Sequence, residues 1–277
     1  MTALQPKPAL NRKPYVAGQF YPGDPGSLRR EIASHLSRAS GPTRAARGIV
    51  VPHAGYMYSG SVAGAVYGTA GLPRRLVLLG PNHTGLGRAL ALASRGAWET
   101  PLGMARIDEA LADLILDATN IVEEDDAAHH AEHSLEVQIP FLQEVLGDFQ
   151  FVPICVGTGR FSELATLGAA VGAAIQTLGE PVCIVMSTDM SHYEPAAVAK
   201  EKDHKAIGRI QALDAEGLHA VVRREEISMC GYAATTAGLH ALARLGADHA
   251  DLIAYANSGE VSGDLHEVVG YAGLLIP

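Results

Sequence analysis

Residues 49–60 read IVVPHAGYMYSG, in which a short apolar run is followed at once by a histidine, His53. Residues 76–85, LVLLGPNHTG, repeat this arrangement and place His83 just after a second apolar run. Continuous runs of β-branched and aliphatic residues are typical of strands that are buried on both faces. Both histidines are therefore predicted at the carboxyl ends of buried strands, where open α/β sheets bind their ligands.

A third stretch, CIVMSTDMSHYEP at residues 183–195, also has an apolar run followed by polar residues, among them Asp189 and His192. A single histidine in such a place is often a hydrogen-bonded core residue, and Asp189 would equally well cap a local turn through its side chain. Three placements at the same end of three strands are not what core packing predicts. The sequence therefore favours a functional site at this edge of the sheet.

Apolar runs and stretches with helical spacing alternate along the rest of the chain. The predicted strands are Arg47 to Val51, Arg75 to Leu79, Phe149 to Val156, Pro181 to Met186, Ala250 to Ala256 and Val268 to Leu275. The predicted helices are Leu28 to Leu36, Ser59 to Thr69, Asp108 to Ala118, Phe161 to Leu178, Ala196 to Ala212 and Gly231 to Leu245. Alternation of this kind indicates a three-layer α/β/α sandwich, and residues 1–277 are expected to form a single domain.

The composition of the chain excludes several classes of protein. Of 277 residues, 48% are apolar, so extensive disorder is excluded. With 21 basic and 30 acidic side chains the formal charge is −9, which argues against nucleic-acid binding. No apolar run approaches the ~20 residues that cross a bilayer, and residues 1–15 lack the apolar core of a signal peptide. A cytoplasmic protein without a membrane partner is expected.

Cys230 precedes the segment GYAATTAGLHAL, whose small residues predict a helix packed closely on the sheet. A thiol at a helix N-terminus is a candidate thiolate, although a buried inert cysteine is the alternative at this position. Cys155 and Cys183 lie inside apolar strands and are expected to be inert.

Two neutral imidazoles and one anionic ligand form the kind of site that holds a divalent transition metal with positions left open. His53, His83 and Cys230 satisfy this count. His192 would then act as an acid or base beside the metal, and Asp189 would fix its tautomer or support a ligand.

At these residues the sequence resembles the Memo family, whose bacterial and archaeal members include protein B of AmmeMemoRadiSam systems. The matching segments follow one another along nearly the whole chain. They are GQFYP at 18–22, VPHAGYMYSG, LLGPNH, ETPLG at 99–103, EHSLEVQIPFL at 132–142, VPICVG, STDMSHY and MCGYAATTA.

The resemblance implies a fold similar to the catalytic subunit of class III extradiol dioxygenases, which use non-haem Fe(II). It also implies metal ligation by His53, His83 and Cys230, with His192 and Asp189 in the same pocket. The dioxygenases have a glutamate as third ligand, and the cysteine found here shifts preference towards copper or a more covalent iron site. Fe(II) is the expected metal and copper the alternative, with oxygen-dependent oxidation of a small substrate as the reaction. Family association further implies AMMECR-type and radical SAM proteins as partners.

Two other catalytic interpretations remain open. His129, Glu132 and His133 fit the H-x-x-E-H pattern of inverted zinc metalloproteases, which requires both histidines on one helix. His133 lies in a family-like segment and is expected to contact substrate in the shared pocket, whereas His129 and His130 are expected to be solvated. In a metal-free hydrolase, Cys230 would instead be a nucleophile with His192 as its base.

A non-catalytic module that binds a peptide or small ligand in the same cleft is the last alternative. Asn82, Tyr56 and Tyr58 would supply polar and aromatic contacts to such a ligand, although loop tyrosines often pack internally. Asn82, His133 and Tyr56 are therefore the predicted substrate-binding residues.

Overall fold

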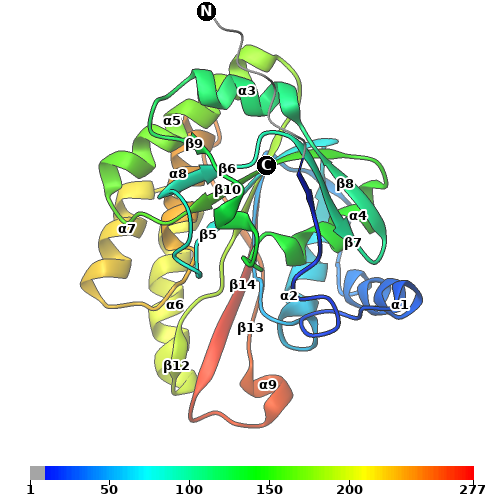
Figure 1. Ribbon diagram of the computed structural model, residues 1–277. Coiled ribbons are helices and arrows are strands. Elements are labelled where there is room, and N and C mark those ends of the chain that lie inside the picture. The colour runs from blue at the N-terminus through cyan, green and yellow to red at the C-terminus, as the bar shows by residue number, and fades with distance from the viewer. Residues whose placement is uncertain (1–9) are drawn as a thin grey trace, which may run out of the picture.

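A computed structural model describes residues 10–277 of the chain. Residues 1–9, which make up much of the proline-rich start, lie outside the described part. Figure 1 shows a twisted central sheet with helices on both of its faces. The expected three-layer α/β/α sandwich is therefore confirmed.

Four parallel strands form the centre of the sheet in the order β10-β5-β11-β3. They are β3 (Gly48–Val51), β5 (Arg75–Pro81), β10 (Gln150–Val156) and β11 (Cys183–Ser187). Nearly all of their residues are buried, because helices cover both faces. This burial explains why the four strands are continuous apolar runs in the sequence.

The remaining strands extend the sheet on both sides. Beyond β3 lies β14 (Val268–Ile276), which runs antiparallel to it and pairs with β13 (Asp251–Asn257) and β12 (His192–Glu194). Beyond β10 lie β8 (Gly103–Ile107), β7 (Gly96–Thr100) and β1 (Leu10–Arg12), while β6 (Leu90–Leu92) and β9 (Glu123–Glu124) branch from β10. A separate parallel pair consists of β2 (Arg44–Ala45) and β4 (Ala70–Gly71).

The helices divide into two groups, one for each face of the sheet (Figure 1). One face carries α3 (Glu109–Asp117), α5 (Phe161–Leu178), α6 (Ala196–Gln211), α7 (Ala215–Arg224) and α8 (Tyr232–Arg244). The other carries α1 (Pro25–Leu36), α2 (Tyr56–Thr69) and α4 (Ile139–Leu146). Short helical segments are η1 (Ala127–His129), η2 (Glu136–Gln138) and α9 (Gly259–Ser262). Each group encloses its own apolar core against the sheet.

The predicted close packing of α8 is confirmed. A Cβ atom on Gly238 would lie 2.4 Å from the sulfur of Met186 on β11, and one on Gly168 of α5 would lie 2.4 Å from the carbonyl oxygen of Ala237. Only glycine allows helix and sheet to approach so closely. Gly238 of α8 and Gly168 of α5 therefore allow α8 to pack closely against both β11 and α5.

α5 has the length and apolar composition of a membrane-spanning helix, although 44% of its residues are buried inside the structure. Its apolar side chains, among them Leu164, Leu167 and Val171, belong to the core between the helices and the sheet. Its composition is therefore explained by packing against α8 and α3.

The sequence did not predict the hairpin of β7 and β8. Most residues of β8 are exposed, and the hairpin turns at Gly103, whose φ of 121° requires glycine. An exposed strand lacks the continuous apolar run by which the central strands were predicted. β1 and β12, with three residues each, are too short to give a periodic signal.

Candidate metal centre

The carboxyl ends of β3, β5 and β11 meet at one edge of the sheet, because β11 lies between the other two and runs parallel to both. His53, His83 and Asp189 each stand two residues beyond the end of their strand. Parallel neighbours with the same offset deliver their side chains to the same place. The strand-end pattern thus brings together residues that are far apart in the sequence.

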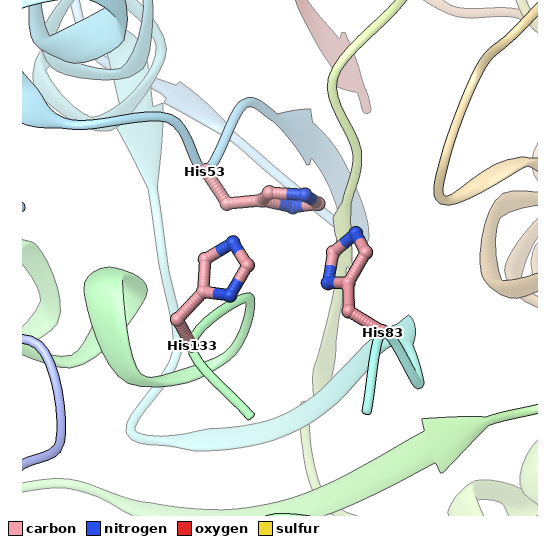
Figure 2. A group of neighbouring side chains, drawn as sticks. All are labelled: His53, His83 and His133. Atoms are coloured by element: carbon pink, nitrogen blue, oxygen red, sulfur yellow. The ribbon is translucent and has the colours of Figure 1, made fainter. Parts of the chain in front are cut away.

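Three imidazoles face one another at this edge, those of His53, His83 and His133 (Figure 2). One ring nitrogen of each lies within 4.8 Å of one nitrogen of the other two. The ring centroids of His83 and His133 are 4.8 Å apart and nearly parallel, and that of His53 lies 5.2 Å and 5.5 Å from them. Nitrogen atoms at this separation are close enough for side-chain adjustment to place them around one ion.

His83 is held by a buried carboxylate. Its Nδ1 lies 2.9 Å from Oε1 of Glu132, and its backbone N–H donates to Oε2 of the same residue at 2.6 Å. Burial opposes ionisation of Glu132, but the hydrogen bond and charge of His83 and the N–H of Ser134 outweigh it and lower the pKa to about 2. An ionised carboxylate only accepts, so Nδ1 of His83 is the donor, and in the neutral ring Nε2 carries the lone pair.

Cys230 lies beside His53, with its Sγ 3.2 Å from Nε2 of that histidine. The backbone N–H of Asp189 donates to the same sulfur at 3.2 Å. A Cβ on Gly231 would stand 2.4 Å from the carbonyl oxygen of Ser187, so glycine lets the start of α8 pass directly against the end of β11. Burial, and then the charge of Asp189, raise the pKa of the Cys230 thiol.

Asp189 and His192 follow β11 in the chain. Oδ1 of Asp189 accepts the backbone N–H of His53 at 2.7 Å, and burial raises the pKa of this carboxyl to about 6. Nδ1 of His192 lies 2.8 Å and 2.9 Å from the carbonyl oxygens of Met190 and Ser228. Carbonyl oxygens only accept, so Nδ1 of His192 bears a proton and Nε2 is free to accept one.

Burial and neighbouring charges keep the imidazole of His53 neutral. Burial is the main reason that the pKa of His53 lies well below its ordinary value, and the neighbouring charges of His133 and His83 lower it further. Burial likewise lowers the pKa of His133, although Glu132 opposes this shift. Neutral imidazoles have a lone pair that can bind a metal ion.

Arg12 contacts the loop that carries Glu132 and His133 and holds it in place through buried polar contacts. Its Nη2 lies 2.7 Å from Oε2 of Glu136 and donates to the carbonyl oxygen of Glu132 at 2.8 Å, and both ionic side chains are 1% exposed. Its guanidinium also lies 4.5 Å from the ring centroid of Trp98. No sequence pattern indicates this role, because an arginine near the start of a chain is not distinctive.

Two of the predicted substrate-binding residues are occupied by internal contacts. Tyr56 is 3% exposed, and its hydroxyl donates to the carbonyl oxygen of Val137 at 2.6 Å. The side chain of Asn82 shapes its own loop, since Nδ2 donates to the carbonyl oxygen of Leu86 and Oδ1 accepts the N–H of Gly85. Of the predicted three, His133 is the one that lies in the imidazole cluster.

The expectation that His129 is solvated is wrong, whereas that for His130 is confirmed. His129 is completely buried in η1, with Nδ1 3.3 Å from Sγ of Cys155 and its ring against Trp98. Burial explains why its pKa falls to about 4. Because η1 ends at His129 and His133 lies in the loop beyond it, the helix that an inverted zinc protease requires does not form.

Cys155 and Cys183 are fully buried in β10 and β11, as predicted for inert thiols. Burial raises the pKa of both. Residues that sequence reasoning missed are Glu132 as the partner of His83 and Ser187 as the partner of His53. Each stands beside a residue that was considered, Glu132 in EHSLE and Ser187 in STDMSH, but nothing in the sequence shows where their side chains point.

Comparisons with known proteins agree with this fold and these segments. The profile of the Memo family, described as Memo-like protein, matches residues 12–275. A MEMO1 family protein of Methanopyrus kandleri is 42% identical over 96% of this chain and 99% of its own length. One from Methanothermobacter thermautotrophicus is also 42% identical, over 95% of this chain and 99% of its own.

Among solved structures, an uncharacterized protein from Escherichia coli K12 superposes with a TM-score of 0.54 at 13% identity. The match covers 82% of this chain and 98% of that one, and at this identity it shows the fold alone. The extent and identity of the sequence matches, by contrast, show descent from a common ancestor. The chain belongs to the Memo family.

Proposed function

We propose that the protein binds a divalent transition metal through Nε2 of His53, Nε2 of His83 and Sγ of Cys230, with His133 beside them. The observation that carries the proposal is that both histidines use Nδ1 in hydrogen bonds within the protein, which leaves Nε2 of each as the nitrogen that can bind a metal. The contact between Cys230 and His53 adds a sulfur to the two nitrogens. Histidines fixed in this way are typical of metal ligands.

The donor set indicates which metals fit. Imidazole nitrogen suits iron, copper and zinc, and thiolate sulfur favours softer ions. Fe(II) is our first assignment and copper the alternative. The side chain of His83 is 33% exposed, so the site is open on one side to solvent and to small molecules.

As the reaction, we propose oxygen-dependent oxidation of a small substrate, for which the metal would supply binding and activation of substrate and O₂. His192 would accept a proton at Nε2, since its Nδ1 is held by two carbonyl oxygens. Asp189 would keep His53 in place through the backbone N–H that it accepts. His133, on the rim of the cluster, would contact the substrate.

One observation weighs against the metal-free hydrolase. The imidazole in contact with Cys230 is that of His53, whereas the hydrolase would use His192 as the base. For the non-catalytic binding module, Asn82 and Tyr56 already have partners within the protein. The metal centre is therefore the better supported function.

Metal analysis tests the proposal. Protein purified and loaded anaerobically with Fe(II), or separately with Cu(I), is desalted and its bound metal is measured. We expect stoichiometric metal in the wild type, and its loss in His53→Ala and in Cys230→Ala. Cys183→Ala, which removes a buried thiol away from the site, is the matched control and should retain metal.

Full metal content in Cys230→Ala would contradict the assigned ligand set and favour the nucleophile. Retention of a bound peptide or small ligand after loss of both His53 and His83 would favour the binding module. Location in the cytoplasm, which was expected from the sequence, and association with AMMECR-type and radical SAM proteins, which the family resemblance implies, are further proposals. Fractionation of a native host tests the location, and co-purification tests the association.

A further inference from the structure

The hydroxyl of Ser187 lies at the centre of a buried polar group beside His53. Ser187 is the last residue of β11 and is completely buried. Its Oγ lies 2.7 Å from the carbonyl oxygen of Ser134, 2.9 Å from Nε2 of Gln138 and 2.9 Å from Nδ1 of His53. One hydroxyl thus joins the end of β11, the histidine that follows β3, and the loop that carries His133.

The orientation of Gln138 is fixed by its other contacts. Its Nε2 also lies 2.9 Å from the carbonyl oxygen of Pro52, and its Oε1 accepts the hydroxyl of Tyr67 at 2.9 Å. Because a carbonyl oxygen only accepts, the atom that faces Pro52 is the amide NH₂. Gln138 therefore donates a hydrogen bond to Ser187.

The remaining contact follows from counting protons. A serine hydroxyl has a single proton and two lone pairs. The proton of Ser187 goes to the carbonyl oxygen of Ser134, and one lone pair receives the N–H of Gln138. The other lone pair faces His53, so Nδ1 of His53 must be the donor, and in the neutral ring Nε2 is then unprotonated.

We propose that Ser187 is a positioning residue of the metal centre, which holds His53 in the Nδ1–H tautomer and directs its Nε2 lone pair to the ligand space. This inference rests on the proposed function. Sγ of Cys230, 3.2 Å from the same Nε2, marks the direction in which that lone pair points. Without the hydroxyl, His53 would have no acceptor for Nδ1–H and would be free to place its proton on Nε2.

The two histidines are thus held by different chemistry. His83, which is partly exposed, donates to the carboxylate of Glu132, whereas the buried His53 donates to a neutral hydroxyl. An additional carboxylate at the position of Ser187 would bury a charge with few partners, which is costly. The Ser187 hydroxyl is neutral, and its proton and both lone pairs are engaged in hydrogen bonds. It can therefore orient the His53 ring without the cost of burying a charge.

Two measurements test the proposal, and the first needs no metal. Long-range ¹H–¹⁵N NMR of the metal-free wild type shows which nitrogen of His53 is protonated. We expect the proton on Nδ1, and a shift of the proton towards Nε2 in Ser187→Ala. A wild-type spectrum with the proton on Nε2 would overturn the proposal even if Ser187→Ala fails to fold.

The second measurement is the affinity for Zn(II), a redox-inert probe, by calorimetric titration. Ser187→Ala should bind ~10–100-fold more weakly than the wild type, the usual effect of losing a residue that orients a ligand. Ser191→Ala is the matched control, because it removes an equally buried hydroxyl that makes no hydrogen bond to His53, His83 or His133, and it should bind like the wild type.

Equal affinity of Ser187→Ala and the wild type would overturn the positioning role. Failure of the wild type to bind Zn(II), Fe(II) or Cu(I) would instead refute the proposed function. In that case the NMR comparison of wild type and Ser187→Ala still decides whether Ser187 sets the tautomer of His53.

Discussion

Sγ of Cys230 lies 3.2 Å from Nε2 of His53, although 177 positions of the chain separate the two residues. The contact depends on two elements that run to the same edge of the sheet, the end of β3 and the start of α8. It places a soft sulfur donor beside an imidazole nitrogen whose Nδ1 is already engaged by Ser187. This pairing distinguishes the site from one built of nitrogen and carboxylate ligands alone.

The first prediction concerns the sulfur. Replacing Cys230 by serine keeps the size of the side chain but exchanges a soft donor for a hard one, so affinity for Cu(I) should fall far more than affinity for Fe(II). With Co(II) as a spectroscopic probe, the wild type should show a sulfur-to-metal charge-transfer band that Cys230→Ser lacks. His133→Ala should keep the band, and a band that survives in Cys230→Ser would exclude Cys230 as the source of the sulfur.

The second prediction concerns the carboxylate behind His83. In the wild type, both carboxylate oxygens of Glu132 accept hydrogen bonds from N–H groups. Glu132→Gln replaces one of these oxygens by an NH₂ group, which cannot accept. The variant should therefore no longer hold His83 in its orientation. We expect metal affinity to fall by ~10–100-fold, as measured by competition with a chelator. Glu123→Gln, which alters an exposed glutamate of β9, serves as control and should bind metal normally. An unchanged metal affinity in Glu132→Gln would show that Glu132 does not support metal binding through His83.

The third prediction compares neighbouring cations. Arg12→Met breaks a buried ion pair and leaves the carboxylate of Glu136 without its cation, which costs about 3–5 kcal/mol of unfolding free energy. Lys13→Met removes the exposed partner of Glu99, and such surface pairs contribute only about 0–1 kcal/mol. Urea unfolding of the two variants measures both values. Similar losses in the two variants would mean that Arg12 has no special structural role.

The fourth prediction is a pH dependence that arises from His129. Its pKa in the folded protein is about 4, below the ordinary value of 6.5, because burial and then Arg12 disfavour its protonated form. The unfolded chain therefore binds more protons between these two values, and stability falls as the pH is lowered through this window. The loss should amount to about 2 kcal/mol between about pH 7 and about pH 4.5.

Unfolding of metal-free protein at both pH values measures this effect. His129→Gln should reduce the difference between them by about 2 kcal/mol, since glutamine does not titrate there. His130→Ala, which changes the exposed neighbour, should keep the wild-type difference. If His129→Gln shows the same acid loss as the wild type, other groups account for the pH dependence.

The sequence by itself determined the central strands, the helices on both faces except α4 and α7, and the three residues that follow β3, β5 and β11. It could do so because burial on both faces forces a continuous apolar run, and because the end of such a run marks where His53, His83 and Asp189 leave the sheet. The bounds of α5 agree with the prediction at both ends, since its apolar pattern extends over the whole helix.

Only the tertiary structure decided which polar groups fix the histidines. The hydrogen bonds of Ser187 to His53 and of Glu132 to His83 join segments 134 and 49 residues apart. Tyr56 and His129 lie in buried positions that their loop-like sequence context did not reveal. A local pattern records whether a residue faces a core, whereas the direction of a side chain and its partner depend on how distant segments pack, and these contacts set the chemistry of the site.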